Sequence, residues 1–326
     1  MISLTPSRES EQIAVVVSDD ARINGSKIYL NRHALDYSNV APKAQCGLED
    51  IKSGRIGRRV RRADEEIIEE AIESMQAGDS DDPPEGLREE LADLYRGRAA
   101  AKQRSLLGKD LKVVDGTVMP MPIKRPGFRE AIFVIGPAGA GKSTWAVRYI
   151  VMWKQMFPRG AVYRFSRVED DRTFDRIKGM YKNVVIDERM LSEPVTAEML
   201  KSMSPDQPVL VVFDDIDTIK DDNVRESVMK LRDDLLETGR HNSFYVISTS
   251  HKAMNWNSTK TSTNEATAVT FFPRSGTSGS IRDFLRKKCG YDADKIKRLM
   301  NLPSLWVTVY LTYPNYTVHE HGVFLD

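Results

Sequence analysis

The chain has 326 residues, of which 40% are hydrophobic and 29% are charged, as is ordinary for a soluble globular protein. The net charge of +1 leaves no overall field for a polyanionic partner, so any nucleic-acid surface must come from local clusters of basic residues. Two cysteines far apart in the sequence, Cys46 and Cys289, argue against a disulfide framework, and the absence of a signal pattern or of an apolar run of about 18–20 residues predicts an intracellular, soluble protein without a transmembrane segment.

Residues 1–125 are rich in charge and predict a smaller mixed N-terminal region, partly disordered without a partner. Residues 14–32 read as a β-hairpin, because two β-prone runs surround the turn-forming pair Asn24-Gly25. A run of six basic residues between Lys52 and Arg62 is a candidate phosphate contact or nuclear import signal, although it also fits a solvated surface. Amphipathic helices are expected over 63–76 and from 87 onward, separated by a turn-rich loop.

Residues 126–326 alternate short apolar runs with helical stretches, which predicts an α/β domain with a mostly parallel central sheet flanked by helices. The runs are apolar along their whole length, as expected for strands that are buried on both faces. The predicted strands are 131–135, 161–165, 183–187, 209–213, 244–249, 266–272 and 305–311, and the predicted helices are 142–157, 222–238, 280–289 and 293–300.

The sequence GPAGAGKST follows the first of these strands and fits the pattern G-x-x-x-x-G-K-[ST] of a phosphate-binding P-loop, or Walker A motif. Its glycines let backbone N–H groups point at phosphate oxygens, and the helix that follows adds its positive N-terminal end. Lys142 would contact the β- and γ-phosphates of ATP, Ser143 would bind Mg²⁺, and Thr144 would reach the α-phosphate. The residues expected to bind the nucleotide are Gly136, Pro137, Ala138, Gly139, Ala140, Gly141, Lys142, Ser143 and Thr144.

The strand 209–213 ends in two acids, Asp214 and Asp215, which fit the Walker B motif that accompanies a P-loop. Ligands of open α/β sheets bind at the carboxyl ends of the strands, where these acids lie. We expect Asp214 to hold Mg²⁺ and Asp215 to act as the base for the attacking water. Adjacent acids also occur as ordinary caps at strand ends. The histidines and cysteines form no convincing metal set, so Mg²⁺ is the only metal predicted.

Four further segments, in this order and spacing, resemble the genome-packaging ATPases of large double-stranded DNA viruses, the poxvirus-type branch of the FtsK–HerA superfamily of P-loop ATPases. The resemblance covers about residues 126–326, and its more specific part is the Gly-Arg-His turn followed by a strand that ends in Thr-Ser-His. The segments are SRVEDDRTFD (166–175), VVFDDID (211–217), LLETGRHNSFYVISTSH (235–251) and NEATAVTFFPRSG (264–276).

The resemblance implies a RecA-like ATPase that moves double-stranded DNA into a capsid as a homo-oligomeric ring, a hexamer or a pentamer. It implies that Ser250, with Thr249 and His251 beside it, senses the γ-phosphate, and that Arg240 or Arg274 reaches the nucleotide of a neighbouring subunit. Either arginine could instead be a surface charge. The implied partners include capsid or portal proteins, and the implied location is the host-cell cytoplasm, the viral factory or the virion.

Candidate DNA contacts and two rival functions stay open. The segment 281–299 carries seven basic residues at partly helical spacing, and the polar loop 252–265 is long enough to face the pore of a ring. Both also fit an ordinary exposed surface. The first rival is a small-molecule P-loop kinase, which would need an acceptor site and a lid. The second is an ATP-dependent switch or scaffold without useful turnover.

Overall fold

The computed structural model describes residues 2–6, 10–31, 111–125, 127–240, 242–253, 259–275 and 278–325. The basic run at 52–62, the helices expected over 63–76 and from 87, and part of the loop 252–265 therefore lie outside the described residues. The elements in chain order are β1 (Ile2–Ser3), β2 (Ser10–Val17), β3 (Lys27–Asn31), β4 (Leu111–Lys112), β5 (Thr117–Pro120), β6 (Ala131–Ile135), α4 (Lys142–Met156), β7 (Ala161–Ser166), η3 (Phe174–Ile177), β8 (Lys182–Val185), α5 (Arg189–Ser192), α6 (Ala197–Ser202), β9 (Val209–Phe213), η4 (Ile216–Thr218), α7 (Asp222–Thr238), β10 (Phe244–Ser250), α8 (Lys260–Asn264), β11 (Ala268–Phe271), α9 (Ser278–Lys287), α10 (Ala293–Met300), β12 (Val307–Tyr310), β13 (Tyr316–His319) and β14 (Gly322–Leu325).

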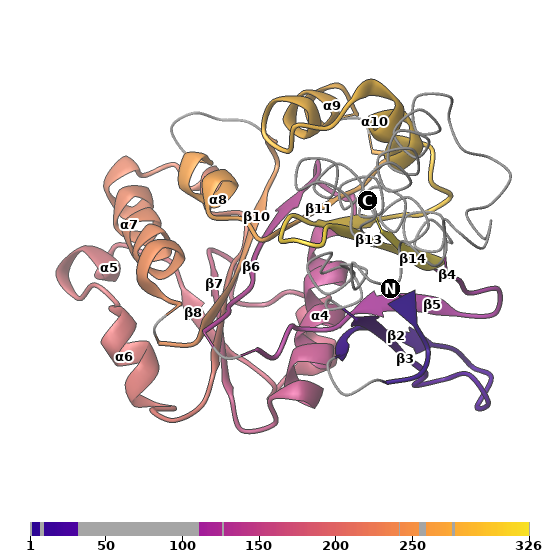
Figure 1. Cartoon of the computed structure of the whole chain (residues 1–326). Coiled ribbons are helices and arrows are strands. Elements are labelled where there is room, and N and C mark those ends of the chain that lie inside the picture. Colours follow the sequence, from indigo (N-terminus) through magenta and orange to yellow (C-terminus); the bar gives the residue numbers. More distant parts are fainter. Residues whose placement is uncertain are drawn as a thin grey trace, which may run out of the picture. The chain divides into compact units, whose positions relative to one another are not determined.

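The large sheet has the strand order β4-β14-β13-β12-β11-β6-β10-β9-β7-β8 (Figure 1). The strands from β11 to β8 pair in parallel, which confirms the expected P-loop NTPase fold with a mostly parallel sheet. The antiparallel strands β12, β13, β14 and β4 extend the sheet beyond β11. Because β10 lies between β6 and β9, the P-loop and the Walker B acids emerge from strands that share a common neighbour.

Side chains alternate along the parallel strands between two covered faces. On β6, Ile132 and Val134 join a core with Trp145 and Tyr149 of α4, whereas Phe133 and Ile135 point to the opposite face, which α9 and α10 cover. On that second face, the odd-numbered residues of β9 pack against α7. Figure 1 shows α4 apart from α7, α9 and α10. With both faces buried, the exposed backbone of the sheet is at its edges, and the carboxyl edge carries the candidate site.

A four-stranded sheet, in the order β1-β3-β2-β5, is built from the ends of the N-terminal region. The expected pairing of the two strands in 14–32 is confirmed, but the connection spans residues 18–26 rather than a two-residue turn, and Asn24 Oδ1 accepts from the Ser18 N–H at 3.2 Å within it. Residues 2–30 and 110–326 form one compact unit. The rest of the N-terminal region lies outside the described residues, so the division at residue 125 stays a prediction. In the described part of the chain, no helix combines the length and apolarity that a membrane crossing requires.

Candidate nucleotide-binding site

The P-loop runs from the end of β6 to the start of α4 and depends on its glycines. Gly139 and Gly141 have φ angles of 75° and 106°, a left-handed conformation that side chains with a Cβ rarely adopt. A Cβ on Gly136 would lie 2.8 Å from the ring of Phe272, which packs beneath the loop. The Gly136 N–H donates to the Ser250 carbonyl at 3.1 Å, so the loop is also fixed to the end of β10.

The first turn of α4 presents its N–H groups without a side-chain cap, and it contains no acidic residue. Lys142 lies within the loop: its Nζ donates to the carbonyls of Gly136 at 3.0 Å and Pro137 at 3.3 Å. Ser143 and Thr144 follow in the same turn. The helix start has no side-chain cap, the loop before it is rich in glycine, and Lys142 reaches back to that loop. These features suit a polyphosphate, so the residues fit the predicted nucleotide.

Asp214 is buried and bound to an arginine that the sequence analysis did not single out. Arg164 of β7 donates to Asp214 Oδ2 through Nη2 at 2.7 Å and Nε at 3.1 Å, and its guanidinium stacks on the ring of Phe174. The other oxygen, Oδ1, lies 3.3 Å from the hydroxyl oxygen of Thr249. Burial raises the pKa of Asp214 above its ordinary value, against the opposing charge of Arg164. The sequence signal was a charged residue within the apolar strand AVYRF.

Asp215 faces the P-loop. Its φ of 52° is unusual for a residue with a side chain, and its backbone N–H donates to the Thr249 hydroxyl at 2.8 Å. The same hydroxyl donates to Asp215 Oδ1 at 2.8 Å, and Lys142 Nζ lies 3.5 Å from that oxygen. The predicted base is therefore next to the predicted phosphate-binding lysine, held by a residue at the end of β10.

The end of β10 supplies the polar link between the two motifs. His251 lies with Nδ1 3.4 Å from Lys142 Nζ and Nε2 3.0 Å from Asp215 Oδ2. The Ser250 hydroxyl donates instead to Asp217 at 2.7 Å, while its carbonyl contacts Gly136. The structure thus brings Thr249 and His251 against the Walker B acids by their side chains, and Ser250 against the P-loop by its backbone.

The residues predicted for Mg²⁺, Ser143 and Asp214, lie at this same edge, together with Asp215. Among the described residues no group of three or more His, Cys, Asp or Glu side chains is arranged to hold a metal by itself. Mg²⁺ that is bound with a nucleotide takes most of its ligands from phosphate and water, and needs one or two oxygens from the protein. A hydroxyl and a nearby carboxylate meet that need.

The two candidate arginines lie at opposite edges of the sheet. Arg274 follows β11, whose carboxyl end is beside the P-loop, whereas Arg240 follows α7 and precedes the start of β10. Both are exposed. Burial lowers the pKa of Arg129, just before β6, and the nearby charge of Arg240 adds to this effect against the opposing charge of Glu265. Arg240 therefore lies at the edge of the sheet opposite the P-loop of its own chain.

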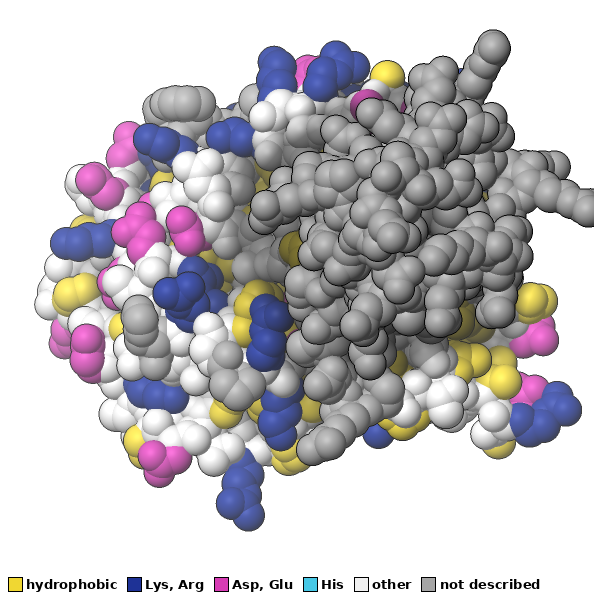
Figure 2. All heavy atoms as spheres, in the orientation of Figure 1, with side chains coloured by type: hydrophobic (Ala, Val, Ile, Leu, Met, Phe, Trp, Pro, Cys, Tyr) yellow, Lys and Arg dark blue, Asp and Glu magenta, His cyan; other side chains and the backbone are white. Residues whose placement is uncertain are grey.

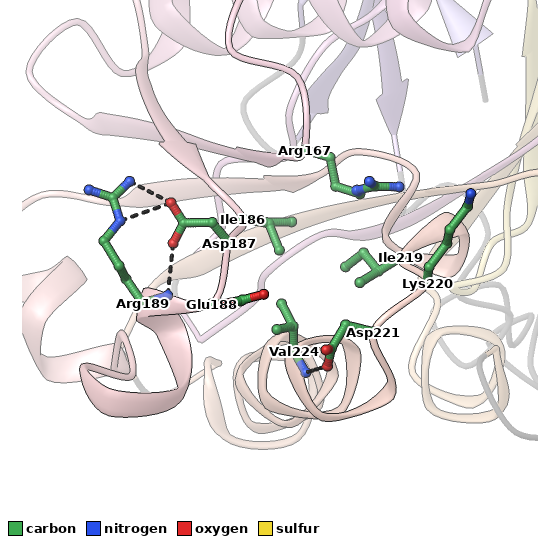
Figure 3. A pocket seen from close by; sticks show the side chains of 9 residues that line it. All are labelled: Arg167, Ile186, Asp187, Glu188, Arg189, Ile219, Lys220, Asp221 and Val224. Atoms are coloured by element: carbon green, nitrogen blue, oxygen red, sulfur yellow. Dashed lines mark hydrogen bonds and ion pairs between the residues drawn. The ribbon is translucent and has the colours of Figure 1, made fainter.

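A pocket of about 470 Å³ lies on the same carboxyl edge but beyond β9 and contains no P-loop residue. Figure 3 shows its apolar side chains, Ile186, Ile219 and Val224, below the cations Arg167 and Lys220. Arg189 turns aside to pair with Asp187 at 2.5 Å. The remaining lining residues are Glu188 and Asp221, so the pocket has charges of both signs.

The chain is similar to a protein of Sputnik virophage, uncharacterized protein V3, with 35% identity over 235 residues that make up 70% of this chain and 90% of the virophage protein. This chain belongs to the V3 family. The model of the NACHT domain also matches residues 130–288 of this V3-family chain, the range that holds the P-loop, the Walker B acids and β10.

Solved structures similar to the V3-family chain include the DNA-packaging ATPase B204 from Sulfolobus Turreted Icosahedral Virus, with 10% identity and a TM-score of 0.41 over 58% of this chain and 94% of that one. They also include the genome packaging NTPase B204 from Sulfolobus turreted icosahedral virus 2 in complex with AMPPCP, with 12% identity and a TM-score of 0.39 over 57% and 92%. The fold of the V3-family chain is assigned from its own strand order and pairing.

Proposed function

We propose that this chain hydrolyses ATP and uses the energy to move double-stranded DNA during the packaging of a viral genome. The observation that carries the proposal is the convergence of Lys142, Asp215 and His251 at one edge of a parallel sheet, with a lysine inside a glycine loop and a carboxylate 3.5 Å away. The geometry of the site does not identify a substrate. We infer double-stranded DNA and a capsid from the resemblance of residues 126–326 to packaging ATPases.

Each residue has a defined part in the proposed reaction. The loop N–H groups and Lys142 bind the β- and γ-phosphates, and the hydroxyl of Ser143 and a carboxylate of the Walker B pair hold the accompanying Mg²⁺. This ion neutralises charge on the phosphate oxygens when it is bound. Asp215 orients a water molecule and takes its proton as the water oxygen attacks the γ-phosphorus and the bond to the β-phosphate oxygen breaks. The Thr249 hydroxyl and His251 keep Asp215 in place.

The proposed assembly is a ring of identical subunits in which an arginine of one copy reaches the nucleotide of the next. Arg240 suits this part by its position, since it is exposed at the edge opposite its own P-loop. Arg274 lies on the P-loop side and would act within its own subunit or across a different contact. A trans-acting arginine contributes about 10³–10⁵ in rate in P-loop enzymes.

The test is steady-state ATP hydrolysis by the full chain with Mg²⁺, with and without long linear double-stranded DNA, from low to moderate salt. Lys142→Ala is the blank, and the oligomeric state is measured in the same buffers. We expect hydrolysis that DNA stimulates and that loses this stimulation as salt rises, because phosphate contacts release counterions. Hydrolysis indifferent to DNA in an assembled ring would contradict the motor, and phosphoryl transfer to a small molecule would establish a kinase instead.

A further inference from the structure

Positive charge is concentrated on the helix pair that follows β11. Residues 278–300, which contain α9 and α10, carry seven basic and three acidic residues, whereas the whole chain has a net charge of only +1. Figure 2 shows dark blue Lys and Arg side chains gathered at the top of the view, where Figure 1 places α9. The local excess is therefore a property of this surface and not of the protein as a whole.

The sequence of α9 fixes which side faces outward. Ile281, Phe284 and Leu285 are buried in the core that α9 and α10 share with the sheet. Arg282, Arg286 and Lys287 consequently project from the opposite side, which also carries Asp283, and all of them are exposed. We call the three basic residues the α9 basic face. Arg282 and Arg286 are one turn apart, about 6 Å along the helix axis.

The α9 basic face lacks the internal partners that many cations of this chain have. Arg22 pairs with Asp20 and Arg189 with Asp187, both at the surface. By contrast, the side chains of Arg282, Arg286 and Lys287 make no hydrogen bond or ion pair with any other residue that the structure describes. None of the large exposed hydrophobic side chains lies on α9 or α10 either. A surface of unpaired cations without an apolar centre fits a polyanion better than a protein partner.

The α9 basic face is connected to the nucleotide site through the core. Ile135, the residue before Gly136 of the P-loop, packs in the same cluster as Phe284 and Leu285. Phe272, at the end of the strand that leads to α9, lies against the P-loop glycines. The strand that leads into the P-loop and the helix α9 therefore pack on the same core cluster.

We propose that the α9 basic face contacts the phosphate backbone of double-stranded DNA and is a surface through which the motor holds its substrate. The proposal rests on the function proposed above and names the residues for its DNA contact. A duplex carries one negative charge per about 1.7 Å of its axis, so several phosphates lie within the span of the three side chains. Contacts of this kind are independent of base sequence.

The test compares two triple variants of the full chain. The first changes Arg282, Arg286 and Lys287 to Gln, which removes three charges and keeps the length of the side chains. The control changes Arg148, Arg176 and Lys230 to Gln, which removes the same charges from exposed positions on α4, η3 and α7. Affinity for a short fluorescent duplex is measured by anisotropy at several salt concentrations, and ATP hydrolysis is measured without DNA.

We expect the first variant to bind DNA more weakly and with a slope of log affinity against log salt that is lower by about 2–3, since each lost phosphate contact removes about 0.9. Hydrolysis without DNA should stay as in the wild type, and the control should keep the wild-type slope. An unchanged slope in the first variant, or an equal fall in the control, overturns the assignment while leaving the motor intact. A wild-type chain that binds no DNA at low salt overturns both.

Discussion

Replacing His251 tests how the two halves of the candidate site are joined. An ammonium group can only donate, so Nδ1 must accept from Lys142, and Nε2 must carry the hydrogen that it gives to Asp215 at 3.0 Å. The imidazole thus contacts two different partners, one through each ring nitrogen. Two substitutions separate these contacts, because Gln keeps a donor near the Nε2 position and Asn keeps an acceptor near the Nδ1 position.

The expected effects differ in kind. His251→Asn removes the hydrogen bond to a charged carboxylate, worth about 1.5–3 kcal/mol, and should lower kcat about 10–100-fold with little change in KM. His251→Gln keeps that bond and should stay within a few-fold of the wild-type kcat. Since His251→Gln loses the acceptor that competes with phosphate for Lys142, its affinity for ATP should equal or exceed that of the wild type.

The assay is steady-state hydrolysis over a range of ATP concentrations, with binding of a non-hydrolysable analogue measured separately. His251→Ala serves as the reference that lacks both contacts and should match the Asn variant in kcat. A Gln variant that loses as much kcat as the Asn variant, or an Asn variant with full kcat, would refute the reasoning that Asp215 depends on His251 for its orientation.

Three further perturbations test the surroundings of the site. Arg164→Met leaves Asp214 buried without its partner and should lower the free energy of unfolding by about 3–5 kcal/mol, as measured with denaturant. A double variant that also carries Asp214→Asn should recover part of this loss. If the effects of the two substitutions simply add, the pairing is contradicted. Burial raises the pKa of Glu130 to about 7 from an ordinary 4.5, so the folded state binds more protons than the unfolded state between these pH values, and stability should fall as pH rises through this window. Glu130→Gln should remove this fall, as measured by thermal unfolding at several pH values. An identical pH dependence of the unfolding temperature in both proteins would contradict the raised pKa of Glu130. Gly239→Ala puts a Cβ against the carbonyl of Leu235 and should lower the unfolding temperature by several degrees, roughly the effect of 1–2 kcal/mol, unless the turn before β10 can open.

The parts of this site that follow from short stretches of sequence are those that could be predicted. The strands β6 and β9 match their predicted bounds to the residue, because continuous apolar runs end at a glycine loop and at paired acids. The P-loop was recognisable for the same reason. The strand β14 was not predicted, since it has only four residues and begins with a glycine.

Contacts between residues on different strands could not be predicted from the sequence, because they depend on the order of the strands in the sheet. The pairing of Arg164 with Asp214 requires β7 to lie beside β9, and the position of His251 requires β10 to lie between β6 and β9. Asp214 was recognisable from the sequence as a Walker B acid, but its pairing with Arg164 could not be recognised before that order was known. The packing of Phe272 under Gly136 likewise depends on β11 lying beside β6.

The shared core of the two sheets decides how the chain can be shortened. Ile13, Val118 and Ile123 lie in the same cluster as Trp145 and Tyr149 of the helix that starts the nucleotide site. A protein that begins at residue 126 would lose these residues and expose the apolar side of α4 to water. The N-terminal strands therefore belong to the core of the domain that carries the candidate site and cannot be removed without uncovering it.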